Sequence, residues 1–156
     1  MKTGLGFRFN METNDLYRIG IDLGGTNIKG ILVSSIGEVR AKHLCPTDTE
    51  RGPNGVAESI GELTDKLLSS GNLGRQDMAG VGIGVPGVTT AEGVVVLAPN
   101  LDWHHVPFKT ILSDRLGVPV EIDNDASVAA LGEARLGAGK GLSLIHISEP
   151  TRLGMI

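Results

Sequence analysis

Asp22 stands between an apolar run and a pair of glycines, a combination suited to binding phosphate and metal. The apolar runs 17–21 and 31–33 on either side indicate two strands joined by a tight turn of small residues. Adjacent glycines leave backbone N–H groups uncovered, so a phosphate can approach closely, and the carboxylate is placed to hold a metal ion through water. A β-hairpin with a Gly-Gly turn is the alternative, although a hairpin requires neither the carboxylate nor the Thr-Asn pair that follows. The candidate residues are Asp22, Gly24, Gly25, Thr26 and Asn27.

A second polar cluster, Asp-Asn-Asp at 123–125, lies between a strand pattern and an alanine-rich helical pattern. Asn and Asp are favoured helix N-caps, so local capping is the alternative, but capping explains only one of the three residues. A carboxylate at the carboxyl end of a strand lies where α/β sheets bind ligands. Asp125 can accept a proton from a substrate hydroxyl, and the adjacent helix N-terminus favours its ionised form. The resulting weak base is sufficient for phosphoryl transfer, because the hydroxyl loses its proton late.

The string Gly-Ile-Gly-Val-Pro-Gly at 82–87 matches the G-x-G-x-x-G pattern of dinucleotide-binding turns. We reject that interpretation, because the string lies inside an expected strand (78–85) and the β-branched residues after it do not open a helix. A tight Pro-Gly turn at the strand end is the better interpretation, and such a turn can line a pocket. Gly80, Gly82 and Gly84 share one side of the strand, which permits close approach of a backbone or a ligand.

Residues 99–103 (Pro-Asn-Leu-Asp-Trp) place an amide, a carboxylate and an indole in one loop. The trio can hydrogen-bond and flank a polar small molecule, and a turn around a buried Trp103 is the alternative. His104 and His105 do not indicate a metal site, because adjacent side chains point apart and no Cys or carboxylate lies at ligand spacing.

Length and composition describe an ordinary globular domain. The 156 residues can bury a core, the net charge of −4 offers no basic surface for nucleic acid or an anionic membrane, and no apolar run reaches membrane-spanning length. Residues 1–16 lack the apolar core of a signal peptide, and Met11 is a second candidate start. The single cysteine, Cys45, excludes an internal disulfide and suits a reducing cytoplasm.

The spacing of apolar residues predicts an α/β layer. The first three strands are joined by gaps too short for helical crossovers, so they are expected to be antiparallel neighbours. Strands are predicted around 19–21, 28–33 and 39–44, and at 78–85, 94–97 and 118–123. Helices are predicted from Gly52-Pro53 to 69–71, from Pro107 to Gly117 and from 124 to 137. Their apolar stripes are Val56, Ile60, Leu63 and Leu67 in the first helix, and Phe108, Ile111, Leu112 and Leu116 in the second.

Four motifs together resemble the ROK family, the sugar kinases and sugar-responsive repressors of the actin/hexokinase/Hsp70 superfamily. They occur in family order over about residues 17–141, and the joint pattern is specific although each piece alone is not. The resemblance implies the N-terminal lobe of a ribonuclease H-like α/β fold, a mixed sheet with helices, and it is greatest to the bacterial ROK glucokinases. The motifs are 20–27 (Gly-Ile-Asp-Leu-Gly-Gly-Thr-Asn), 82–87, 98–101 (Ala-Pro-Asn-Leu), and 123–126 (Asp-Asn-Asp-Ala) running into 129–133 (Ala-Ala-Leu-Gly-Glu).

The resemblance implies ATP and Mg²⁺ as cofactors and a hexose as substrate. Asp22 and the 24–26 turn would form the first phosphate motif, and Asp125 would be the base for the hydroxyl that takes the γ-phosphoryl group. Ser127 stands where the family often has Asn, which leaves its role open. The implied sugar-side residues are Gly84, Pro86, Gly87, Asn100, Asn124 and Asp125.

Other parts of the family pattern are missing from this sequence: a glycine-rich second phosphate motif, a Gly-Glu-x-Gly-His sugar motif and a Cys/His zinc cluster. We therefore expect structural zinc only in a second lobe, and we expect the 156-residue chain itself to be inactive. Residues 142–152 resemble the in-frame translation of a sequencing adapter, and a divergent strand with a turn at Pro150 is the alternative. The expected division is a disordered or non-native extension at 1–16, the ROK lobe at 17–141 and a non-native tail at 142–156.

Two functions of different class fit the resemblance. The favoured one is a cytoplasmic, homo-oligomeric, ATP-dependent sugar kinase of glucokinase type, with no nucleic-acid or membrane partner. The other is a ROK repressor that binds sugar without phosphorylating it. Such repressors carry a winged helix-turn-helix before the first strand, and the residues ahead of Tyr17 show no helical pattern or basic face. The motifs do not distinguish glucose from N-acetylglucosamine, N-acetylmannosamine or fructose.

Overall fold

A five-stranded sheet forms the centre of the computed structural model, which describes residues 16–124. Its order is β3-β2-β1-β4-β8; β1–β2 and β2–β3 pair antiparallel, and β1–β4 and β4–β8 pair parallel. The antiparallel arrangement predicted for the first three strands is confirmed. The strands are β1 (Tyr17–Leu23), β2 (Asn27–Val33), β3 (Val39–Pro46), β4 (Met78–Val85) and β8 (Val120–Asn124).

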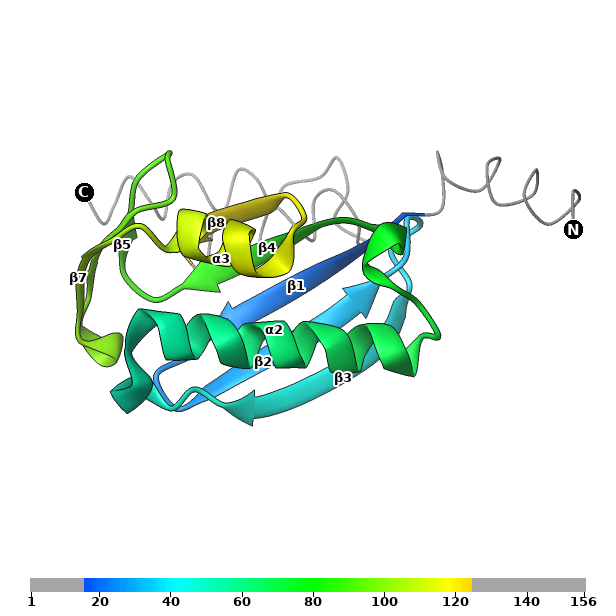
Figure 1. Ribbon diagram of the computed structural model, residues 1–156, viewed down its shortest axis with the longest axis horizontal. Helices are drawn as coiled ribbons and strands as arrows, with labels where there is room; N and C mark the ends of the chain where they lie inside the picture. Colours follow the sequence, from blue (N-terminus) through cyan, green and yellow to red (C-terminus); the bar gives the residue numbers. More distant parts are fainter. Residues whose placement is uncertain (1–15, 125–156) are drawn as a thin grey trace, which may run out of the picture.

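The helix α2 (Gly52–Ser70) covers one face of this sheet (Figure 1). Its predicted apolar stripe is buried, and the members are Val56, Ile60, Leu63 and Leu67. Gly30 of β2 lies beneath α2. A Cβ at this position would come within 2.8 Å of the Leu67 side chain. Each buried Leu or Ile contributes about 1.5–3 kcal/mol, so this stripe holds α2 against the first strands.

The helix α3 (Phe108–Leu116) lies beside α2 on the same face of the sheet (Figure 1). As predicted, it begins after Pro107 and ends at Gly117, whose φ of 66° is the left-handed conformation that favours glycine. In its predicted stripe, Ile111 is half-buried and the other three residues are buried. Within residues 16–124, no helix is long and apolar enough to cross a membrane.

A small antiparallel sheet, β5-β6-β7, lies at the end of the molecule toward which β1 and β4 point (Figure 1). Its strands are β5 (Val88–Thr89), β6 (Val95–Ala98) and β7 (Trp103–Val106). Three short 3-10 helices complete the described part: η1 (Thr49–Arg51), η2 (Arg75–Asp77) and η3 (Pro99–Leu101).

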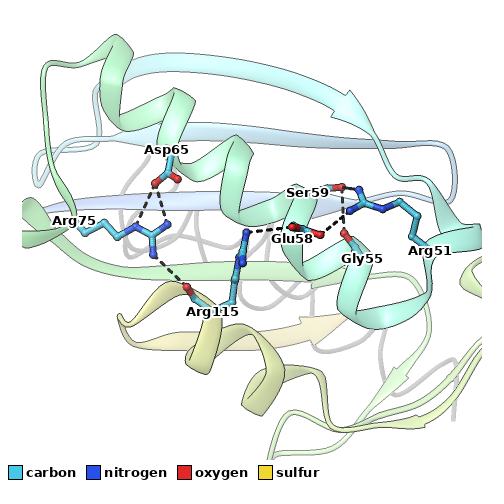
Figure 2. Close-up of polar contacts among 7 residues, drawn as sticks. All are labelled: Arg51, Gly55, Glu58, Ser59, Asp65, Arg75 and Arg115. Atoms are coloured by element: carbon cyan, nitrogen blue, oxygen red, sulfur yellow. Dashed lines mark hydrogen bonds and ion pairs between the residues drawn. The ribbon is translucent and has the colours of Figure 1, made fainter.

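Ion pairs and hydrogen bonds tie α2 to its neighbours (Figure 2). Arg75 of η2 donates to the Asp65 carboxylate on α2 (2.9 Å) and to the Leu116 carbonyl at the end of α3 (2.8 Å). Glu58 of α2 also pairs with Arg115 of α3 (3.8 Å). The last carbonyls of a helix carry partial negative charge, so a guanidinium is well suited to the position that Arg75 occupies.

Some predicted boundaries differ from the structure. β8 begins at 120 instead of 118 and runs on to Asn124, because Asn124 pairs with Val85 of β4. A helix therefore does not begin at 124, and the remainder of that predicted helix lies outside the described residues. The strand predicted at 94–97 is β6, one residue later, and the sequence pattern does not predict β5 or β7, which are too short to show an alternation.

Candidate functional site

The carboxyl ends of three parallel strands meet at one edge of the large sheet, where α/β proteins bind ligands. Asp22 of β1 pairs in register with Gly84 of β4, and Gly84 pairs with Asp123 of β8. Since neighbouring strands lie about 4.8 Å apart, the backbones of the two aspartates are about 10 Å apart, with a glycine between them. On its other side Asp22 pairs with Lys29 of β2, so this row carries charges of both signs.

Strand pleating turns this row away from the helices. Ile21 is buried beneath α2, whereas Asp22 is exposed on the opposite face of the sheet. Asp123 shares the face of Asp22, because both are in register with Gly84. Asn124 is half-buried and turned to the other face. The structure thus brings Asp22 and Gly84 into one row and directs Asn124 to the opposite side of the same edge.

The turn between β1 and β2 is a hairpin turn, so both interpretations of its sequence describe the same backbone. The Gly24 N–H donates to the Asn27 carbonyl (2.9 Å). Neither Gly24 nor Gly25 has a positive φ; Gly24 is required by space instead, because a Cβ there would lie 2.8 Å from the Asn27 carbonyl oxygen. Thr26 and Asn27 are exposed, and within residues 16–124 no acceptor meets the N–H groups of Gly25 and Thr26. Those two donors are open to an anion.

Asn100 brings the residues expected to face the sugar beside this turn. It is exposed in η3, directly after β6, and a Cβ on Gly25 would come within 3.2 Å of the Asn100 Cβ. In the bend after β4, Pro86 is half-buried and Gly87 has φ 146°, where a Cβ would overlap the Leu97 carbonyl of β6. The chain bends at the predicted Pro-Gly position, and β5 follows where a dinucleotide-binding turn would need a helix.

Trp103 is buried and does not face a ligand. Its side chain is 2% exposed and packs at a tilt on Phe108, with ring centroids 4.6 Å apart. Of the two interpretations of residues 99–103, the turn around a buried Trp is the one observed. His104 and His105 are exposed, and the described part of the chain contains no group of three potential metal ligands.

Asp125, the predicted base, lies outside the described residues, as does Ser127. β8 ends at the residue immediately before Asp125, at the same edge as Asp22. The role of Asp125 stays a prediction.

Thr47 contacts the glycine turn, although no motif in the sequence indicates it. Its side chain is fully buried; its hydroxyl donates to the Gly24 carbonyl (2.7 Å) and its N–H to the Thr26 carbonyl (2.9 Å). The predicted antiparallel order of the first three strands is the signal from which the position of Thr47 could have been predicted. The end of β3 lies beside the start of β2, so a hydroxyl residue just after Pro46 falls beside the turn.

Comparison with known proteins identifies relatives for most of the chain. Residues 18–148 match the ROK family. A glucokinase of Halalkalibacterium halodurans is 36% identical over 129 residues, which are 82% of this chain and 39% of that protein. A xylose repressor of Caldicellulosiruptor bescii is 37% identical over 138 residues, which are 87% of this chain and 35% of that protein. The chain therefore spans about two fifths of the length of the curated relatives that it matches.

A solved structure matches the same region. A ROK family glucokinase from Streptomyces griseus, in complex with glucose and AMPPNP, is 34% identical with a TM-score of 0.68, covering 80% of this chain and 38% of that chain. The expected fold class is confirmed: the chain is a partial N-terminal lobe of the actin/hexokinase-like fold. The family match ends at 148, beyond Gly141, and the division at 142–156 stays a prediction.

Proposed function

The chain belongs to the ROK family, and we propose that residues 17–141 are the N-terminal lobe of an ATP-dependent sugar kinase of glucokinase type. The whole protein would transfer the γ-phosphoryl group of ATP to a hexose hydroxyl. The observation that carries this proposal is the close approach of Asn100 to Gly25, because it sets the proposed phosphate-side turn beside a proposed sugar-side residue. Catalysis of this kind depends on holding two substrates side by side.

The residues of the glycine turn fit a nucleoside triphosphate and a divalent cation. Gly25 and Thr26 present N–H donors without an acceptor in residues 16–124, and successive backbone N–H groups in a turn bind phosphate. Asp22 is an exposed carboxylate of the kind that holds Mg²⁺ through water. Mg²⁺ would supply charge neutralisation at the transferring phosphate.

The sugar would lie on the side of Asn100 and the Pro86-Gly87 bend, with Gly84 and Asn124 at the adjoining strand ends. Asp125 would accept the proton of the attacking hydroxyl. Asparagine amides both donate and accept hydrogen bonds, as recognition of sugar hydroxyls requires. We propose a cytoplasmic location and place a structural zinc only in a second lobe.

A sugar-responsive repressor is the second candidate, and the xylose repressor match favours it. In that case the lobe would bind a sugar and perform no phosphoryl transfer. The two candidates differ in one measurable property, which is turnover in the presence of bound sugar.

A chimeric protein tests the proposal. Residues 17–141 replace the matching segment of the Halalkalibacterium halodurans glucokinase, and the unmodified glucokinase is the positive control. A kinase lobe gives ATP-dependent glucose phosphorylation in the ordinary range of about 1–100 s⁻¹, and other hexoses then define the substrate. Glucose or xylose binding by calorimetry without turnover on any hexose would favour the repressor. The 156-residue chain alone is expected to give no turnover.

A further inference from the structure

We propose that Thr47 is a positioning residue that directs the N–H of Gly25 toward a nucleotide phosphate; this inference rests on the proposed kinase function. Thr47 follows β3, is fully buried and touches the turn twice. Its hydroxyl donates to the Gly24 carbonyl at 2.7 Å, and its backbone N–H donates to the Thr26 carbonyl at 2.9 Å.

The geometry of the peptide unit links these contacts to anion binding. A trans peptide is planar, and its C=O and N–H point in opposite directions. Because the Gly24 carbonyl points at Thr47, the Gly25 N–H of the same unit points away from Thr47. That N–H meets no acceptor within the described part of the chain. Thr47 therefore holds the Gly24 carbonyl, which would repel a phosphate, toward the protein interior. The Gly25 N–H donor is left pointing outward.

A glycine turn needs such a constraint more than other turns do. Glycine explores backbone conformations that other residues cannot, so the Gly24–Gly25 peptide can flip when nothing holds its carbonyl. A flipped peptide would present an oxygen atom to the phosphate. The bond from the Thr47 side chain opposes that flip, and its burial shields it from competing water.

The test compares three variants in the chimeric kinase. Thr47→Val removes the hydroxyl at nearly constant volume, and Thr47→Ser retains it. Thr64→Val is the matched control, because Thr64 is a buried threonine of α2 whose hydroxyl has no partner in residues 16–124. We expect Thr47→Val to raise the KM for ATP about tenfold, the scale of one hydrogen bond. Thr47→Ser and Thr64→Val should keep it within about twofold, and the KM for glucose should stay constant throughout.

Other outcomes overturn the role of Thr47. Equal rises in both KM values, or a Ser variant as impaired as the Val variant, would indicate packing rather than orientation of the peptide. An unchanged KM for ATP in Thr47→Val would refute the role while leaving the kinase proposal intact. A chimera with Thr47 that binds no ATP would refute both. If Thr47→Val fails to fold, the NMR amide resonance of Gly25 in the full 156-residue chain is measured instead. We expect MgATP to shift this resonance equally in the unsubstituted chain and in the Thr47→Ser variant. A resonance that MgATP does not move would overturn the role of Thr47.

Discussion

Gly25 faces Asn100 closely, so the turn after β1 lies beside the turn after β6 with no room for a side chain at position 25. A Cβ on Gly25 would come within 3.2 Å of the Asn100 Cβ and 3.3 Å of its carbonyl oxygen. A side chain at position 25 would therefore be tighter against Asn100 than ordinary contacts are, and glycine is what lets the two turns approach this closely. In a kinase, the two substrates would adjoin here.

Gly24→Ala is expected to lower the free energy of unfolding by about 1–3 kcal/mol. The added Cβ would lie 2.8 Å from the Asn27 carbonyl oxygen, which cannot move without opening the hairpin turn. Gly82→Ala is the control, because a Cβ there meets nothing within 4 Å in the described part of the chain. Urea unfolding followed by the emission of Trp103, the single tryptophan, measures both variants. Equal losses in the two variants would contradict the steric explanation.

Asn100→Ala in the chimeric kinase is expected to raise the KM for glucose by about tenfold or more, because a polar contact to a sugar hydroxyl is lost. The free energy of unfolding should change by less than about 0.5 kcal/mol, since the side chain is exposed. Asn54→Ala, an exposed asparagine on α2, controls for the loss of an amide elsewhere. An unchanged KM for glucose would remove Asn100 from the sugar site.

Elements with a local apolar period were predictable, whereas relationships between distant strands were not. The stripe of α2 and the short gaps between the first strands are local signals, and both predictions are confirmed. The row of Asp22, Gly84 and Asp123 depends on the parallel register of three strands separated by helices, which no local period reports. Thr47 belongs to no motif, and only the antiparallel pairing of β3 with β2 brings it beside Gly24 in the turn before β2.

Arg75→Met is expected to destabilise the fold by about 1–2 kcal/mol, because it removes an ion pair and the bonds to the end of α3. Asp65→Asn removes only the charge of the ion-pair partner and should cost less than about 1 kcal/mol, since Asp65 is 60% exposed. Urea unfolding of the two variants measures the difference. If Asp65→Asn costs as much as Arg75→Met, the carbonyl bonds at α3 contribute nothing.

Burial raises the pKa of the Cys45 thiol above its ordinary value; the positive charge of nearby Lys66 lowers this pKa and the negative charge of Glu62 raises it. Iodoacetamide at pH 8 is therefore expected to modify the folded chain more slowly than the urea-unfolded chain, since the thiolate is the nucleophile. Glu62→Gln should accelerate the reaction and Lys66→Met should slow it. Rates that move the same way in both variants would exclude a charge effect.

The same shift predicts a dependence of stability on pH. Below the unfolded pKa the thiol is protonated in both states and contributes no difference. Above about pH 9 the unfolded chain releases its proton first, so the free energy of unfolding falls as the pH rises toward the folded pKa. Cys45→Ala should remove this part of the decline, as measured by urea unfolding between pH 8 and about pH 10.5.

Asp125→Asn in the chimeric kinase is expected to lower kcat by about 10²-fold or more, the scale of a lost general base. Glucose binding should largely survive, because an amide of the same shape still accepts and donates hydrogen bonds. Glu121→Gln is the matched control: it makes the same chemical change on β8, where the carboxylate is 81% exposed and pairs only loosely with Lys109 at 3.4 Å. Steady-state kinetics with ATP and glucose, together with calorimetry of glucose binding, separate the two effects. A kcat for Asp125→Asn close to that of Glu121→Gln would show that another group accepts the proton.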